Sequence, residues 1–385
     1  MKKTKETLSI EIDNEKVKKV VLYLLAFLFP LVLLVGIFIY LKVYPFGENT
    51  YLPVDAFGQY VNFLQYFRNV FLEDGSIIYS LSKSIGGEMY GLFAYYLISP
   101  FNFITLFFQK GNMTFVFDII LILKVATSSL TFTYYLNRRK KADFTNLIFA
   151  IMYSFSAYVV TYGFNIMWLD AVILLPLVVA GIDDIVHSKK NILYIISLSL
   201  TLITNYYVGF MVCIFSLMYF IYKILIGDLE NKKEALTKIG IFIISSICAA
   251  LIAGVILVPV FIGLQDGRAD FSFSKLSLDK NFNIENLMSK FATNSFDLEE
   301  IKNSAMPPVF CGILANVLTL SYFFNGKIKI REKILSLLLL ILFIISFYIK
   351  GINLLWSMGN IPAWYIYRYT FCFSFMYIIF AKKRI

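Results

Sequence analysis

Long apolar runs separated by short clusters of lysine and arginine constrain the fold of this chain more than any other feature. The first run, residues 20–41, has the roughly 20 residues that a helix needs to cross a bilayer, and similar runs recur to the end of the chain. The 385 residues are 59% hydrophobic and 18% aromatic, with a mean hydropathy of +0.74, so most of them cannot form the surface of a soluble domain. The sequence predicts an all-α polytopic membrane protein.

The basic residues lie in the loops between these runs and predict the orientation of the chain. The formal charge of +10 comes from short clusters such as 138–141 and 382–384, which are typical of cytoplasmic loops, and this argues against nucleic-acid binding. With every cluster in the cytoplasm, both termini are cytoplasmic. Ten spanning helices are then predicted, at residues 20–41, 114–136, 144–162, 171–186, 192–204, 208–226, 239–264, 309–324, 334–349 and 365–381.

A shorter apolar run at residues 92–108 interrupts this alternation. Ser99-Pro100 breaks it, and a full crossing here would place the next basic cluster outside, against the positive-inside rule. We therefore expect a re-entrant or interfacial segment, whose freed backbone groups must be covered by protein or water. The predicted organisation is a cytoplasmic tail at 1–19 and a single membrane domain at 20–385, with external loops at 42–113 and 265–306.

Several classes of protein are disfavoured by missing motifs. The chain has neither G-x-x-x-x-G-K-[ST] nor a G-x-G-x-x-G between a strand and a helix, which argues against ATP-driven transport. The cytoplasmic loops are also too short to build a domain for a nucleotide sugar. The four cysteines lie in apolar runs without metal-ligand spacing, and the only histidine, His187, lies in a basic loop where solvation is the simpler explanation.

Two acidic residues beside the membrane are the catalytic candidates. Asp55 follows the first apolar run and Asp170 precedes another, and the predicted topology places both on the external face. Such a carboxylate can act as general base toward a hydroxyl group, or the two can hold a divalent cation such as Mg²⁺ or Mn²⁺. The alternatives are a solvated loop carboxylate or, especially for Asp170, a helix cap.

The same predicted face gathers polar and aromatic residues that could bind a substrate. An arginine offers a planar fork of donors for a phosphate group, although an interfacial arginine among aromatics is also a common membrane anchor. Lys124 lies nearer the middle of the bilayer, where a charge is either functional or paired, here with Asp118. The substrate-binding candidates are Gln59, Tyr60, Arg68, Trp168, Asn205, Arg268, Tyr367 and Arg368.

Five short segments together resemble the bacterial YfhO membrane-protein family. They are residues 55–60 (DAFGQY), Gly86-Gly87 with 95–102 (YYLISPFN), 162–170 (YGFNIMWLD) with Leu175-Pro176, 205–210 (NYYVGF) and 367–371 (YRYTF). The resemblance covers nearly all of this chain but only about the amino-terminal half of a typical member. It implies a fold similar to C-type glycosyltransferases, in which the first external loop carries an essential acidic residue. Asp55 matches that position here, and Asp170 would be the second acidic position.

The resemblance also implies an activity. A sugar would move from a polyprenyl-phosphate donor to a cell-envelope glycopolymer of the teichoic-acid type, on the outer face of the bacterial plasma membrane. The partners would be the donor, the glycopolymer acceptor and membrane lipids. Two alternatives stay open: a transporter or flippase for lipid-linked sugars or polysaccharides, and an inactive truncated family member.

Overall fold

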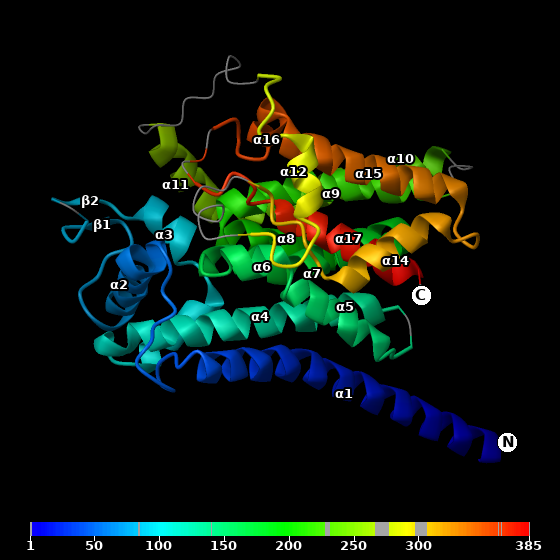
Figure 1. Ribbon diagram of the computed structural model, residues 1–385, viewed down its shortest axis with the longest axis horizontal. Coiled ribbons are helices and arrows are strands. Elements are labelled where there is room, and N and C mark those ends of the chain that lie inside the picture. Colours follow the sequence, from blue (N-terminus) through cyan, green and yellow to red (C-terminus); the bar gives the residue numbers. More distant parts are fainter. Residues whose placement is uncertain are drawn as a thin grey trace.

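The protein, described by a computed structural model, is built almost entirely from helices (Figure 1). The structure describes residues 2–83, 85–139, 141–227, 232–265, 277–296, 306–360, 362 and 364–384, and of residues 2–13 only the backbone. The elements are α1 (Lys2–Tyr40), η1 (Ala56–Tyr60), α2 (Val61–Leu72), β1 (Tyr79–Ser80), β2 (Gly87–Glu88), α3 (Tyr90–Tyr96), η2 (Pro100–Phe107), η3 (Lys110–Asn112), α4 (Met113–Asn137), α5 (Thr145–Ser154), α6 (Ala157–Tyr162), η4 (Ile166–Trp168), α7 (Leu169–Ser188), α8 (Ile192–Thr204), α9 (Tyr206–Ile226), α10 (Lys232–Ile252), α11 (Gly254–Gln265), α12 (Ile284–Ser289), α14 (Ile313–Phe324), α15 (Ile330–Tyr348), α16 (Lys350–Leu355) and α17 (Thr370–Arg384).

The prediction of an all-α membrane protein is confirmed, and the number of spans only in part. Within the described ranges, six helices are long and apolar enough to cross a membrane, or seven if one bent pair counts as a span. Three predicted spans contain the shorter apolar helices α8, α11 and α14. The first helix begins at Lys2, so α1 includes residues 2–19 of the predicted cytoplasmic tail.

The bent pair is α3 and η2, which meet at an angle of 99° inside the run expected to be re-entrant or interfacial. Ser99 is extended there, with φ −128° and ψ 135°, and Pro100 opens η2. Proline disfavours the helical conformation in the residue before it and cannot donate a backbone hydrogen bond, so α3 cannot continue through this point. The break lies where the sequence predicts it.

Helix α7 forms the centre of the bundle and α1 lies at its edge. The apolar window of Ile166–Ser188, which includes α7, is 83% buried, whereas that of Asn14–Tyr40 in α1 is 17% buried. Gly181 permits part of this packing, because a Cβ there would lie 2.4 Å from the backbone nitrogen of Tyr194 in α8. Small residues allow membrane helices to approach this closely.

Three of the bundle helices, α7, α9 and α17, run in the same direction. Trp168, Tyr207 and Arg368 lie at or just before their amino ends, and the Arg368 guanidinium contacts the rings of the other two. Near the carboxyl ends of the same helices, Asp183, Lys223 and Lys382 line a single pocket. The amino ends of α7, α9 and α17 therefore lie at one end of the bundle, and their carboxyl ends lie at the other.

The segment between α1 and α4 covers the first of these ends. It contains η1, α2, the small antiparallel pair of β1 and β2, and the bent pair, and Figure 1 shows α2, α3 and the strands together at one side of the molecule. The segment predicted as the first loop therefore contains several short helices, and their place at the membrane interface stays a prediction.

Candidate functional site

Arg368 lies in a setting that leaves its charge uncompensated. Its Nη1 donates to the Tyr95 hydroxyl at 3.0 Å and its Nη2 to the Trp364 carbonyl at 2.8 Å. The guanidinium carbon lies 4.9 Å from the ring centre of Trp168 and 5.0 Å from that of Tyr207. Aromatic faces attract a cation but do not neutralise it. No carboxylate among the described residues forms an ion pair with Arg368, and its buried Nε has no hydrogen-bond partner there.

An open pocket of about 440 Å³ gives access to this arginine. Two tyrosine doublets form much of its wall, Tyr95 and Tyr96 from α3 and Tyr206 and Tyr207 from α9. The rest of the lining is Gly91, Leu92, Leu264, Ser357, Met358, Asn360 and Arg368 itself. The pocket therefore has four tyrosines and a cation in its wall.

Helix ends strengthen the positive potential of this pocket. Tyr206 and Tyr207 are the first residues of α9, and Arg368 precedes Thr370, the first residue of α17. The amino end of a helix carries a partial positive charge and favours a nearby anion. Asn205 caps α9, since its Oδ1 accepts from the Val208 backbone nitrogen at 2.9 Å and its Nδ2 donates to the Tyr95 carbonyl at 2.8 Å. The site thus suits an anionic group.

Asp55 does not line this pocket, but it lies within electrostatic reach of Tyr96, which does. It is half-buried and precedes η1, a π-helical turn of the kind that is frequent at functional sites. Burial, then the charge of Asp55, raises the pKa of Tyr365 to about 12. The pKa of Tyr60 is also raised, by burial first and then by Tyr96 and Asp55. Asp55 is therefore within electrostatic reach of both tyrosines.

The backbone before Asp55 is strained. Val54 has a φ of +49°, in the left-handed region that a β-branched residue rarely enters. Such strain persists only where the surrounding structure fixes it, and it is concentrated at functional sites. Tyr60 supplies part of this support, because its hydroxyl donates to Asn165 Oδ1 at 2.6 Å and its ring lies 5.8 Å from that of Tyr96.

Asp170 occupies a different environment from the one that the sequence suggested. It lies in the first turn of α7, is 3% exposed, and forms an ion pair with Lys124 Nζ at 2.6 Å. Ser99 Oγ donates to it at 3.0 Å, and Lys124 also donates to the Ile166 carbonyl at 2.9 Å. The suggested pairing of Lys124 with Asp118 is wrong, since neither Asp118 oxygen has a hydrogen-bond partner among the described residues.

The other predicted residues fall into several groups. Trp168, Asn205 and Arg368 meet at Tyr95, and Tyr60 lies beside Asp55. Gln59 is exposed, and Tyr367 is fully buried. Arg68 donates to the Phe108 carbonyl at 2.8 Å and to Glu73 at 3.1 Å, which holds the first loop together. Arg268 lies outside the described residues.

Tyr95 is the residue that sequence reasoning left out of the site. Its hydroxyl accepts from Arg368 and from Trp168 Nε1, the latter at 3.2 Å, and its carbonyl accepts from Asn205. The available signal was its place in one of the five recognised segments, next to Tyr96. Tyr207 was missed in the same way, although the doublet Tyr206-Tyr207 follows Asn205 directly.

A divalent-cation site is one of the alternatives that the sequence leaves open for Asp55 and Asp170. The described residues contain no group of three or more His, Cys, Asp or Glu side chains that could hold a metal ion. The Asp170 carboxylate is already occupied by Lys124 and Ser99, so it does not combine with Asp55 as a metal ligand. No metal step is therefore assigned to this site.

These features define a multi-pass membrane protein with an anion-suited aromatic pocket at one end of the bundle. Comparison with known proteins identifies the family: the model of the bacterial membrane protein YfhO matches residues 26–385, so the chain belongs to the YfhO family. It is 26% identical over 251 residues to the uncharacterized protein YfhO of Bacillus subtilis (strain 168). That match covers 59% of this chain and 28% of the relative, and no solved structure matches.

Proposed function

We propose that the chain is a membrane glycosyltransferase that moves a sugar from a polyprenyl-phosphate donor to a cell-envelope glycopolymer of the teichoic-acid type. The observation that carries the proposal is Arg368, a half-buried cation without a carboxylate partner among the described residues, at the wall of an aromatic pocket. A phosphate group would supply the missing negative charge. The proposed setting is the outer face of a bacterial plasma membrane, with both termini in the cytoplasm.

The proposed reaction divides its work between Asp55 and Arg368. The Asp55 carboxylate takes the proton of the acceptor hydroxyl, and the hydroxyl oxygen forms a bond to the anomeric carbon of the sugar. The bond from that carbon to the phosphate oxygen breaks, and polyprenyl phosphate leaves with the electron pair. The Arg368 guanidinium stabilises the negative charge that develops on this phosphate. Tyr95, Trp168 and Tyr207 hold the guanidinium in place.

Asp170 and Lys124 have a positioning role in this proposal. Their ion pair connects α7, the Ile166 carbonyl before it and Ser99 at the break between α3 and η2. These segments carry Trp168 and Tyr95, whose side chains contact Arg368. The pair therefore fixes the geometry of the pocket without contacting the reacting atoms.

An apolar groove of about 440 Å³ lies on the other side of α3 and would accept part of the polyprenyl chain. Helix α3 contributes Tyr95 and Tyr96 to the pocket and Phe93 to the groove, which continues along Phe67 and Phe103. Its lining is almost wholly apolar, with Ser99, Asp170 and Thr204 as the polar exceptions. If the donor phosphate binds at Arg368, the polyprenyl chain would lie close to this groove.

A transporter or flippase is the second candidate, and the buried Lys124–Asp170 pair favours it. Ionisable groups inside membrane helices commonly mark a transport path. The pair is 1% and 4% exposed at its side chains and Asp170 borders the apolar groove. Because the chain matches only 28% of its relative's length, the activity of the whole protein is a proposal under either reading.

The experiment that tests the transferase proposal compares wild type with Asp55→Asn. Purified chain is incubated with radiolabelled polyprenyl-phosphate sugar and envelope polymer, and transferred label is counted. We expect a loss of about 100-fold or more, because a positioned general base contributes at least that much. Equal transfer by folded Asp55→Asn would contradict the assignment, and vesicle uptake without transfer would favour the transporter.

A further inference from the structure

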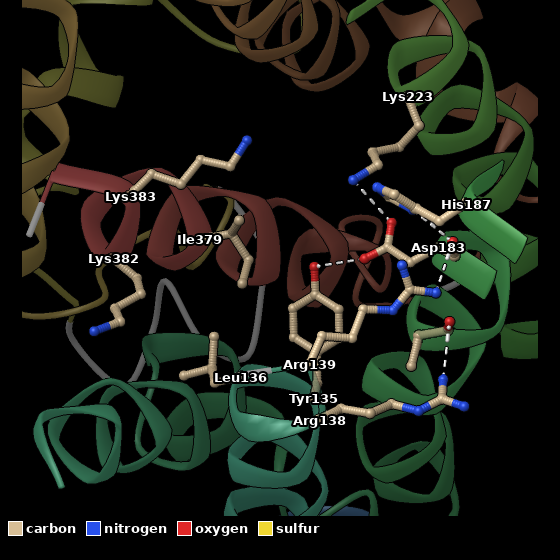
Figure 2. A pocket seen from close by; sticks show the side chains of 11 residues that line it. Tyr135, Leu136, Arg138, Arg139, Asp183, His187, Lys223, Ile379, Lys382 and Lys383 are labelled. Atoms are coloured by element: carbon tan, nitrogen blue, oxygen red, sulfur yellow. Dashed lines mark hydrogen bonds and ion pairs between the residues drawn. The ribbon is translucent and has the colours of Figure 1, made fainter. Parts of the chain in front are cut away.

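A second pocket lies at the opposite end of the bundle, where α4, α7, α9 and α17 finish. It has a volume of about 240 Å³, and Figure 2 shows its lining from all four helices. Its cations are Arg138 and Arg139 after α4, Lys223 of α9, and Lys382 and Lys383 of α17. We call these five residues and the cavity between them the basic pocket. None of them belongs to the site around Arg368.

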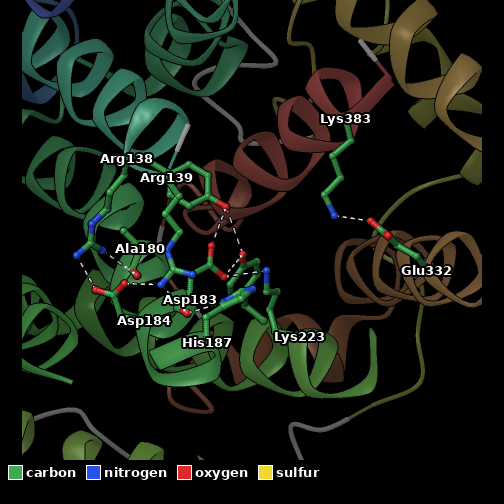
Figure 3. Close-up of polar contacts among 11 residues, drawn as sticks. Arg138, Arg139, Ala180, Asp183, Asp184, His187, Lys223, Glu332 and Lys383 are labelled. Atoms are coloured by element: carbon green, nitrogen blue, oxygen red, sulfur yellow. Dashed lines mark hydrogen bonds and ion pairs between the residues drawn. The ribbon is translucent and has the colours of Figure 1, made fainter. Parts of the chain in front are cut away.

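The cations of the basic pocket outnumber the carboxylates that contact them. Asp184 accepts from both arginines, at 2.6 Å from Arg138 and 2.5 Å from Arg139 (Figure 3). Each lysine has one carboxylate partner of its own: the pairs are Lys223–Asp183, Lys382–Asp143 and Lys383–Glu332. Among the described residues, five cations against four carboxylates leave one positive charge, and it resides on the arginine pair.

Arg139 has hydrogen-bond donors that no described residue uses. Its Nη2 makes both of its recorded hydrogen bonds, to the Asp183 carbonyl at 3.1 Å and to Asp184. Its Nε and Nη1 have no partner among the described residues, and the side chain is 39% exposed. Both guanidinium edges that can form two parallel hydrogen bonds include Nη2, so the unused Nε and Nη1 can each donate a single charge-assisted hydrogen bond to a phosphate oxygen.

We propose that the basic pocket binds a phosphate-bearing anion, with Arg138 and Arg139 as its main contacts. The headgroup of an anionic phospholipid and free inorganic phosphate share this chemistry. Leu136 and Ile379 give the pocket an apolar side beside the arginines, and basic pockets between membrane helices are known to take anionic headgroups. The carboxylates and the negative carboxyl ends of the helices compete with the ligand, so binding is weak and falls with salt.

Three water-soluble probes test this proposal: short-chain phosphatidylglycerol, short-chain phosphatidylcholine and inorganic phosphate. Each is titrated into the detergent-purified full chain, and the unfolding temperature gives an apparent Kd. Arg138→Gln/Arg139→Gln/Asp184→Asn removes one net positive charge without leaving a buried carboxylate unpaired. Arg139→Lys keeps the charge and removes the unused Nε and Nη1 donors. Lys110→Gln, which disrupts an exposed ion pair with Glu73 elsewhere, is the matched control.

We expect phosphatidylglycerol or phosphate to stabilise wild type, and the triple variant to bind about fivefold more weakly. Arg139→Lys should also weaken binding, and Lys110→Gln should match wild type. If phosphate alone reproduces the stabilisation, the ligand is the free ion; if only phosphatidylglycerol does, it is the headgroup. Equal affinity in wild type and both arginine variants, or an equal loss in Lys110→Gln, would overturn the proposal.

Discussion

The two ends of the bundle hold their cations in different ways. At one end, Arg368 rests against Trp168 and Tyr207 and forms no ion pair with a described residue. At the other, every cation of the basic pocket has a carboxylate partner. Since α7, α9 and α17 begin at the first end and finish at the second, their dipoles add to this difference.

The two ends therefore differ in how much positive charge each cation offers to a ligand. A cation held by aromatic faces keeps its full charge, so an incoming anion meets no competitor. A cation held by a carboxylate is largely neutralised and contributes mainly to the structure. We therefore expect a single substitution at Arg368 to matter more for ligand binding than a single substitution in the basic pocket, where the charge is shared.

The largest effect is expected for Lys124, the most buried of the carboxylate-paired cations. Lys124→Met leaves the Asp170 carboxylate buried and unpaired, which should lower the free energy of unfolding by about 3–5 kcal/mol. Lys124→Met/Asp170→Asn should recover most of that loss. Unfolding temperature in detergent measures both, and a double variant no more stable than the single one would show that the pair is not the cause.

A smaller effect, on donor binding, is expected when a carboxylate partner is placed beside Arg368. Tyr207→Glu places a carboxylate beside the guanidinium and makes this end resemble the basic pocket, so donor binding should weaken about tenfold, or about 1.4 kcal/mol. Tyr207→Gln is the control that loses the ring without adding charge. If both variants bind the donor equally, the free charge of Arg368 is not what attracts the ligand.

The smallest effect concerns Asp143, the partner of Lys382 at the rim of the basic pocket. Burial raises its pKa, but hydrogen bonds from Thr145 and Lys382 more than offset this and lower it to about 2 from an ordinary 3.8. Because the folded pKa is depressed, this stabilisation is complete above about pH 4 and disappears as the pH falls toward 2. Asp143→Asn should remove that component of acid unfolding, which is followed by circular dichroism, and an unchanged acid-unfolding curve would contradict this assignment.

Local sequence signals predicted the outline of the fold. Apolar runs of sufficient length identified the long spanning helices, and Ser99-Pro100 marked the break between α3 and η2. Both signals depend on neighbouring residues alone. The count of ten spans went beyond the six helices that pass the test of length and hydropathy among the described residues, because predicted spans such as 192–204 and 309–324 contain only the short helices α8 and α14. With 13 and 12 residues, these helices are too short to cross a bilayer on their own.

The sequence predicted which segments form the site, but not all of the contacts within it. Asp55 and Arg368 belong to recognisable segments, and their aromatic neighbours lie close to one another in the structure. The partner of Lys124 was not predictable, because Asp170 is 46 residues away and competes with the nearer Asp118 in any reading by spacing. The packing of α4 against α7, and not spacing along the chain, brings Lys124 next to Asp170.

Binding of the donor to wild type, Asp55→Asn and Arg368→Gln is the most direct test of the account. Radiolabelled polyprenyl-phosphate sugar is titrated against each purified chain, with Lys238→Gln as a control for a carboxylate-paired cation. We expect equal binding by wild type, Asp55→Asn and Lys238→Gln, and binding about 100-fold weaker in Arg368→Gln, since a charged donor to the phosphate is lost. Binding by Arg368→Gln as tight as by wild type would contradict this expectation.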